Sequence, residues 1–142
     1  MKIAIGCDHA AFDVKNKIKK LLSSFNHEVI DLGTDNGASV DYPIYGHAVA
    51  KKVAKKEVDK GIVICGSGIG ISIAANKVKG IRAALCTTPT HAELSRKHND
   101  SNILALGARL TKYSEIESII KIWLNTTFDG GRHLDRIKMI EL

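Results

Sequence analysis

A cysteine stands at the head of a run of alternating glycines in the segment CGSGIG, residues 65–70. Glycines let the backbone approach a ligand closely and can point several N–H groups at an anion. The spacing matches neither the G-x-G-x-x-G pattern of dinucleotide sites nor the Walker loop, which ends in Gly-Lys-Ser/Thr. Glycine spacing alone therefore fits an anion-binding loop and an ordinary strand-to-helix turn equally well.

Cys65 occupies the position in this segment where a thiolate would be favoured. The loop's N–H groups and the start of a following helix both stabilise negative charge, and a thiolate can act as a base or a nucleophile. An arbitrary free cysteine is more often buried and inert. Cys7 and Cys86 lack a comparable loop, and we interpret both as packing residues.

Further proton carriers follow other apolar runs. His98 lies in the polar run 95–100, SRKHND, so it is not expected in the core. It could be a plain solvated histidine, or it could exchange a proton with a sugar ring oxygen, since imidazole titrates near neutral pH. Asp8 and His9 could contact sugar hydroxyls, and Asp8 could also cap the first helix.

Arg132 and Arg136 are four residues apart, so on a helix they project from one face and could clamp a phosphate. Arg109, which follows the last apolar run, could join them. The alternative is that these arginines form surface ion pairs with nearby acidic residues, namely Asp129, Asp135 or Glu141.

The elements that must position these residues follow a β-α-β pattern. Short apolar runs predict strands at 3–5, 29–32, 62–64, 81–85 and 103–106. Helical spacing predicts helices over 14–25, around 48–53, from about 71, near 92, after 114 and over the last segment, 132–142. Thr90 with Glu93 and Ser114 with Glu117 form possible capping boxes.

Near-continuous apolar strands favour a parallel sheet covered on both faces. We therefore predict an α/β protein, a three-layer Rossmann-like fold with a mostly parallel five-stranded sheet and a C-terminal helix, in one domain over 1–142. Ligands of such sheets bind beyond the carboxyl ends of the strands. We expect the segments after strands one and three, together with His98 and Asn99, to assemble into one site.

Composition narrows the function classes. Three cysteines without a C-x-x-C pair disfavour a disulfide framework or a zinc module. No apolar run is long enough for a membrane span, and the N-terminus does not resemble a secretory signal, so a cytoplasmic location is expected. The net charge of +6 attracts phosphate-bearing partners, either metabolites or nucleic acid. Lysines spread over helix faces, without an aromatic RNA-binding motif, argue against nucleic acid.

Taken together, five motifs resemble the type B ribose-5-phosphate isomerases over nearly the whole chain. They are GCDHA at 6–10, DYP at 41–43, CGSGIGISIAANK at 65–77, HND at 98–100 and GGRH at 130–133. The same family contains the galactose-6-phosphate isomerase subunits. The presence of Cys65, His98-Asn99 and Gly-Gly-Arg-His in one chain favours the ribose enzyme.

The resemblance implies an aldose-ketose isomerase of the non-oxidative pentose phosphate pathway, without cofactor or metal. It implies Cys65 as the base, His98 as an aid to ring opening, and Ser67 as a participant in proton handling. The implied substrate contacts are Asp8, His9, Tyr42, Gly66, Gly68, Ile69, Gly70, Asn99, Arg109, Arg132, His133 and Arg136. It also implies a homodimer whose active sites are shared between subunits, with a tetramer left open, a sugar phosphate as the partner, and neither nucleic acid nor membrane.

Two alternatives remain at this point. One is an isomerase of a hexose 6-phosphate, such as allose or galactose 6-phosphate. The other, of a different class, is a nucleotide-binding module without catalysis, for which the net charge and the glycine loop are the motivation.

Overall fold

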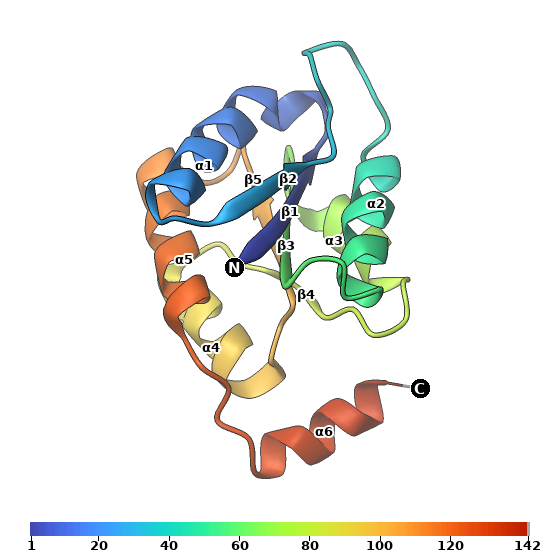
Figure 1. The fold of residues 1–142 in the computed structure, drawn as a ribbon, viewed down its shortest axis with the longest axis vertical. Helices are drawn as coiled ribbons and strands as arrows, with labels where there is room; N and C mark the ends of the chain where they lie inside the picture. The colour runs from blue at the N-terminus through green and yellow to red at the C-terminus, as the bar shows by residue number, and fades with distance from the viewer. Residues whose placement is uncertain (142) are drawn as a thin grey trace.

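Five parallel strands form the centre of the computed structural model, which describes residues 1–141 (Figure 1). The strands lie in the order β2-β1-β3-β5-β4, and every neighbouring pair is parallel. Their bounds are β1 Lys2–Cys7, β2 Glu28–Asp31, β3 Lys60–Cys65, β4 Ala83–Leu85 and β5 Ile103–Gly107. The predicted α/β fold is confirmed, and its sheet is wholly parallel.

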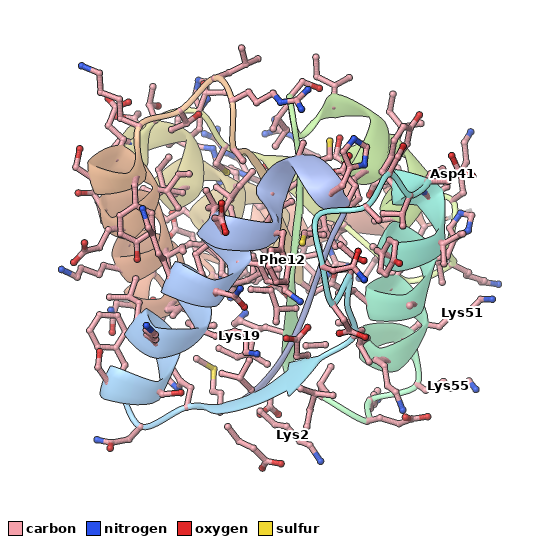
Figure 2. The ribbon with its side chains drawn as sticks, turned by 90° about the horizontal axis from the view of Figure 1, so that it is seen from above. Lys2, Phe12, Lys19, Asp41, Lys51 and Lys55 are labelled. Carbon is pink, nitrogen blue, oxygen red and sulfur yellow. The ribbon has the colours of Figure 1, made fainter. Side chains whose placement is uncertain are left out.

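Helices cover both faces of this sheet, as near-continuous apolar strands require. On one face lie α1 (Phe12–Ser24), α4 (Pro89–Asn99) and α5 (Tyr113–Asn125), and on the other lie α2 (Tyr42–Ala54) and α3 (Ile69–Asn76). Successive residues of a strand point to opposite faces, so Ile3 and Ile5 join the first core and Ala4 joins the second. Figure 2 shows α1 and α2 on opposite sides of the sheet, with Lys51 on the outer face of α2 and Lys55 just past its end.

The predicted C-terminal helix, α6 (Arg132–Ile140), lies outside these layers. In Figure 1 it lies below α4, on the side where the strands begin. Ile137 is its one buried residue within 1–141. An ion pair of 2.6 Å between Arg82 and Glu141 ties the end of the chain to the start of β4. None of the helices within residues 1–141 combines the length and apolar character that a bilayer crossing requires.

Helix starts differ from the predicted ones. Both capping boxes are wrong: α4 begins at Pro89, after Thr88, whose hydroxyl accepts from the His91 N–H at 3.2 Å. Proline suits the first turn because its fixed φ is already helical. The start of α5 follows Lys112 and has no side-chain cap. Likewise α2 begins at Tyr42, earlier than predicted, with Pro43 in its first turn.

A buried lysine fastens α1 to the end of β2. The Lys15 side chain is 1% exposed, and its Nζ donates to Asp31 Oδ1 at 2.7 Å and to the Thr34 carbonyl at 2.6 Å. Burial acts to raise the pKa of Asp31, but hydrogen bonds from Lys15 and Lys19 outweigh it and hold that pKa below its usual value. The stability that this carboxylate contributes is present above its unfolded-state pKa and is lost as the pH falls through the lower folded-state pKa.

Replacing Lys15 by Met is expected to lower the free energy of unfolding by about 3 kcal/mol, because a buried carbonyl and a carboxylate lose their donor. Lys19→Met is the matched control: Lys19 also bonds Asp31, at 2.6 Å, but is 37% exposed. Its loss is expected to stay below about 1 kcal/mol. Urea unfolding of the two variants measures the difference, and equal small losses would contradict a structural role for the buried pair.

Candidate functional site

The thiol of Cys65 lies at the carboxyl end of β3, where the chain turns into α3. Cys65 is 4% exposed, and its Sγ accepts a hydrogen bond from the Gly68 N–H at 3.1 Å. A backbone donor aimed at sulfur and a helix N-terminus that follows directly both place partial positive charge next to the sulfur. The structure therefore places the cysteine as predicted, with a specific donor that the sequence could not identify.

Glycine is required where the loop presses against the end of β5. Gly68 has a φ of +78°, and a Cβ on it would lie 2.9 Å from the Leu106 carbonyl oxygen. A Cβ on Gly107 would lie 2.5 Å from the Ser67 carbonyl oxygen. Sequence reasoning missed Gly107; the available signal was a glycine that ends an apolar run.

Gly68→Ala is expected to lower the free energy of unfolding by about 2 kcal/mol, since it combines a strained positive φ with a backbone clash. It should also displace the N–H that bonds Cys65. Gly37→Ala is the control, because a Cβ there meets nothing within 4 Å and its φ is ordinary. Thermal or urea unfolding tests this expectation, and an unchanged Gly68→Ala protein would refute the tight approach of the loop to β5.

Two N–H groups of the loop are already engaged. The Gly68 N–H bonds the thiol, and the Ile69 N–H donates to Ser67 Oγ at 3.2 Å. The remaining first-turn N–H groups of α3 have no intrahelical partner, as at any helix start. An anion at this loop would therefore meet the N–H groups that these two bonds leave open, among them that of Gly70.

Three more predicted residues lie around this loop, at the carboxyl ends of β1 and β3, which are adjacent in the sheet. Asp8 is buried, and its carboxylate caps the short 3-10 helix η1 (His9–Ala11) by accepting the Ala10 N–H at 3.0 Å. His9 is held by a 3.2 Å hydrogen bond between its Nδ1 and the Val40 N–H. Tyr42 packs on Gly70, where a Cβ would lie 2.5 Å from its ring. Asp8 thus caps η1, the turn before α1, and not α1 itself, whose N-cap residue Ala11 forms no side-chain cap. The hydrogen bond to Val40 fixes the ring of His9.

Arg109 brings a positive charge to the loop. Its backbone N–H donates to the Gly66 carbonyl at 2.9 Å, and a Cβ on Gly66 would lie 3.4 Å from Arg109 Cδ. The side chain is exposed and forms no ion pair with any residue in 1–141. An anion can therefore approach this guanidinium. We call Asp8, His9, Tyr42, Cys65–Gly70 and Arg109 the loop half of the candidate site.

The other candidates lie at the opposite edge of the sheet. A helix between parallel strands runs back to their amino ends, so His98 and Asn99, at the end of α4, lie beside the starts of β4 and β5. The Asn99 carbonyl accepts from Arg82 Nε at 2.9 Å, just before β4. The length of β5 separates the two edges by roughly 13 Å. His98 and Asn99 therefore do not lie beside the thiol loop of the same chain, and their joining that loop stays a prediction about two subunits.

The C-terminal helix adds to this second group. His133, in the first turn of α6, stacks on His98 with ring centroids 4.3 Å apart. Arg132 and Arg136 extend from the same helix, so Arg109 does not join them within one chain. We call His98, Asn99, Arg132, His133 and Arg136 the helix half.

The arginines of α6 are not neutralised by the acids considered above. Within 1–141 neither Arg132 nor Arg136 forms an ion pair, Asp135 pairs with Lys138, and Glu141 pairs with Arg82. The predicted alternative of surface ion pairs is wrong, and both guanidiniums are exposed. Burial, His98 and these arginines together lower the pKa of His133. The helix half is an open cationic surface suited to a phosphate.

The remaining cysteines behave as packing residues. Cys7 and Cys86 are fully buried, and burial raises the pKa of each thiol to about 11. Neither sulfur is a thiolate at neutral pH. Cys65 alone combines a strand-end position, a glycine loop and a backbone donor.

An open parallel sheet carries a thiol loop at its switch point between β1 and β3. Three arginines, Arg109, Arg132 and Arg136, have no acidic partner within residues 1–141. This arrangement suits an enzyme for a small phosphorylated substrate. The sequence model of the Ribose/Galactose Isomerase family matches residues 3–140. The chain belongs to this family and is an isomerase.

Individual relatives agree. Ribose-5-phosphate isomerase B of Escherichia coli is 50% identical over 139 residues, covering 98% of this chain and 93% of the relative. A galactose-6-phosphate isomerase subunit of Clostridium acetobutylicum is 46% identical over 128 residues, covering 90% and 74%. The solved ribose-5-phosphate isomerase B of Clostridium thermocellum superposes with a TM-score of 0.99 at 52% identity, covering 99% of this chain and 95% of that one.

Proposed function

We propose that this enzyme interconverts D-ribose 5-phosphate and D-ribulose 5-phosphate, with Cys65 as the base. The observation that carries the proposal is the Cys65 thiol at the carboxyl edge of the sheet, which accepts a hydrogen bond from the Gly68 N–H. Arg109, which has no ion-pair partner within residues 1–141, lies beside the same loop. The ribose-5-phosphate isomerases of Escherichia coli and Clostridium thermocellum support the substrate.

The reaction moves two hydrogens without net oxidation. The Cys65 thiolate removes the proton from carbon 2 of the open-chain aldose, and the electron pair shifts to the carbonyl oxygen, giving an enediolate. The resulting thiol returns a proton to carbon 1, while one proton passes from the oxygen on carbon 2 to that on carbon 1. Ser67, two residues from the base, is the proposed carrier of this second proton. Free N–H groups at the start of α3 stabilise the enediolate oxygens, each well-aimed donor contributing about 3 kcal/mol in comparable sites.

Ribose 5-phosphate is mainly a furanose ring, so ring opening must precede proton removal. We assign this step to His98, because imidazole can protonate the ring oxygen near neutral pH. Arg132 and Arg136 would hold the phosphate with paired N–H donors. Asp8, His9 and Asn99 would bind the sugar hydroxyls, and Tyr42 and His133 would line the site.

These roles require the helix half of one chain to meet the loop half of another. We therefore propose a homodimer with two shared active sites. Exposed apolar residues next to both halves support such a contact: Ile44 on α2, Ile69 and Ile73 on α3, and Leu134, Met139 and Ile140 on α6. Burying such a surface between copies would remove it from water. A cytoplasmic location would keep Cys65 reduced, and the product would enter the non-oxidative pentose phosphate pathway.

A second candidate substrate is galactose 6-phosphate, favoured by the 46% identity to a galactose-6-phosphate isomerase subunit. A panel of ribose 5-phosphate, allose 6-phosphate and galactose 6-phosphate decides between them. We expect the greatest kcat/KM with ribose 5-phosphate. A greater value for either hexose phosphate would overturn the assigned substrate, and no turnover of any of the three would overturn the activity itself.

A further inference from the structure

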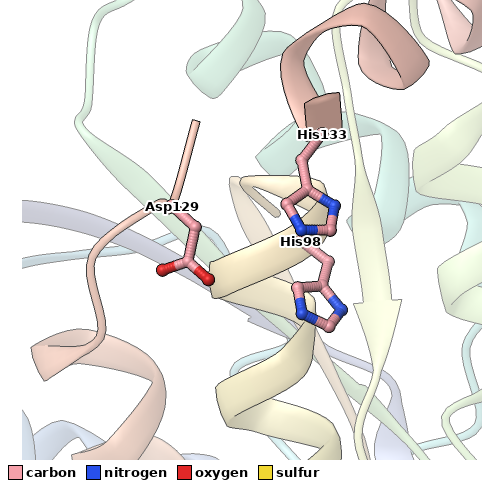
Figure 3. A group of neighbouring side chains, drawn as sticks. All are labelled: His98, Asp129 and His133. Atoms are coloured by element: carbon pink, nitrogen blue, oxygen red, sulfur yellow. The ribbon is translucent and has the colours of Figure 1, made fainter. Parts of the chain in front are cut away.

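Three side chains that can ligate a metal meet at the end of α4: His98, Asp129 and His133. Each offers one ligand atom, and the three atoms lie within 4.8 Å of one another. Figure 3 shows the Asp129 carboxylate beside the two imidazole rings. The sequence pattern indicates no role for Asp129 beyond that of a possible arginine partner, yet its carboxylate forms no ion pair with the residues in 1–141.

We propose that His98, Asp129 and His133 form an inhibitory site for a divalent transition-metal ion, with Zn²⁺ as the best fit. Two imidazoles and one carboxylate are ligands that Zn²⁺ commonly takes, with a fourth position left to water. The inhibitory effect rests on the proposed function, because it arises from capture of the imidazole that opens the sugar ring.

The backbone holds the three ligands close together. Asp129 donates its N–H to the Lys97 carbonyl at 3.1 Å, next to His98. Gly130 and Gly131 have φ values of +68° and +57°, so the chain reverses directly after Asp129. The His133 N–H then donates to the Gly130 carbonyl at 3.2 Å. Three segments thus converge through main-chain contacts, and only side-chain rotation is needed to complete the site.

The helix half therefore has two alternative states, one with the two imidazole rings stacked and one with a metal ion bound. The two imidazole rings are stacked, with an angle of 12° between their planes. Nitrogen lone pairs lie in the ring planes, so two parallel rings cannot both point at one ion. Ligand atoms of a tetrahedral Zn²⁺ site are roughly 3.3 Å apart, so one ring must turn out of the stack as the ion binds. His98 cannot then protonate a sugar oxygen with the nitrogen that holds the metal.

Charge sets the strength of the site. A neutral imidazole is the form of histidine that can ligate a metal ion. Arg132 and Arg136 oppose a cation, so we expect binding in the micromolar range rather than the tight binding of structural zinc. A phosphorylated substrate, which the same arginines attract, would compete for this surface.

Titration calorimetry with ZnCl₂, together with initial rates on ribose 5-phosphate at increasing Zn²⁺, tests the proposal. Wild type should bind one Zn²⁺ per chain through this site and lose activity over the same concentrations, with recovery on adding EDTA. Asp129→Asn removes one anionic ligand and should weaken both binding and inhibition at least 10-fold, while its activity in EDTA stays unchanged. Asp135→Asn is the matched control: it removes the same charge from the exposed side of α6 and should behave as wild type.

Inhibition of Asp129→Asn at the wild-type Zn²⁺ concentration would overturn the proposal, because it would place the ion elsewhere, for example on Cys65. Absence of binding heat, or binding without inhibition of an active enzyme, would also overturn it. Calorimetry separates these results from failure of the proposed function. An enzyme inactive on ribose 5-phosphate in EDTA would refute the assigned reaction and leave the zinc affinities of the variants measurable.

Discussion

Cys65→Ala is expected to reduce the turnover of ribose 5-phosphate at least about 1,000-fold, because the variant has no group at the end of β3 that can take the proton from carbon 2. Binding of the sugar phosphate should remain near the wild-type level, since the proposed phosphate contacts are arginines and not the thiol. Initial rates and calorimetric titration with a non-isomerising substrate analogue measure the two effects. Near-normal turnover would remove Cys65 from the mechanism.

The chain offers a matched control in Cys86→Ala. Cys86 is fully buried, and its thiol has a pKa of about 11, so it carries no proposed chemistry. Its replacement should cost about 1 kcal/mol of stability through lost packing and leave kcat unchanged. Equal loss of activity in both variants would indicate a general packing defect instead of a missing base.

His98→Asn should lower kcat/KM for ribose 5-phosphate at least about 100-fold, since the ring must then open without an acid catalyst. The equilibrium constant ties kcat/KM in the two directions together, so ribulose 5-phosphate cannot serve as an independent comparison. An aldose that cannot close a ring does provide an independent comparison. We expect a loss of less than about 5-fold with 4-deoxyribose 5-phosphate, which lacks the hydroxyl that forms the furanose.

His91→Asn is the control for this substitution. It makes the same change in the first turn of α4, where His91 contacts Thr87 at 3.1 Å. Activity with both aldoses should remain near wild type. If His98→Asn lost equal activity with the cyclic and the acyclic aldose, His98 would act in proton transfer or in binding, and not in ring opening.

The strands were predictable because each is an apolar run that the sheet buries on both faces. All five predicted strands occur, and helices separate them along the chain as predicted. The edge strand β4 begins at Ala83 and is shorter than the run 81–85 indicates. The Arg82 N–H donates to the Asn102 side chain at 2.8 Å and not to a neighbouring strand. The capping boxes failed for a similar reason, since pattern alone does not reveal that Pro89 starts α4 at a different residue.

Within the site, the sequence identified the thiol loop because glycine spacing and a strand end coincide at Cys65. It did not reveal that His98 lies at the opposite edge of the sheet from Cys65 of the same chain, although the rule that helices return to the amino edge of a parallel sheet was available. Residue types suggested one site, and only the three-dimensional arrangement separates the loop half from the helix half. The stacking of His98 on His133 and the approach of Asp129 depend on the reversal at Gly130 and Gly131, which no motif encodes.

We propose that Cys65 of one subunit acts together with His98 of another. Cys65→Ala and His98→Asn chains, co-expressed with different affinity tags and purified through both, give a heterodimer with one site that carries both substitutions and one that carries neither. We predict about half of the wild-type activity on ribose 5-phosphate, from the one intact site of two. Activity no higher than that of the two parent variants would contradict the shared site.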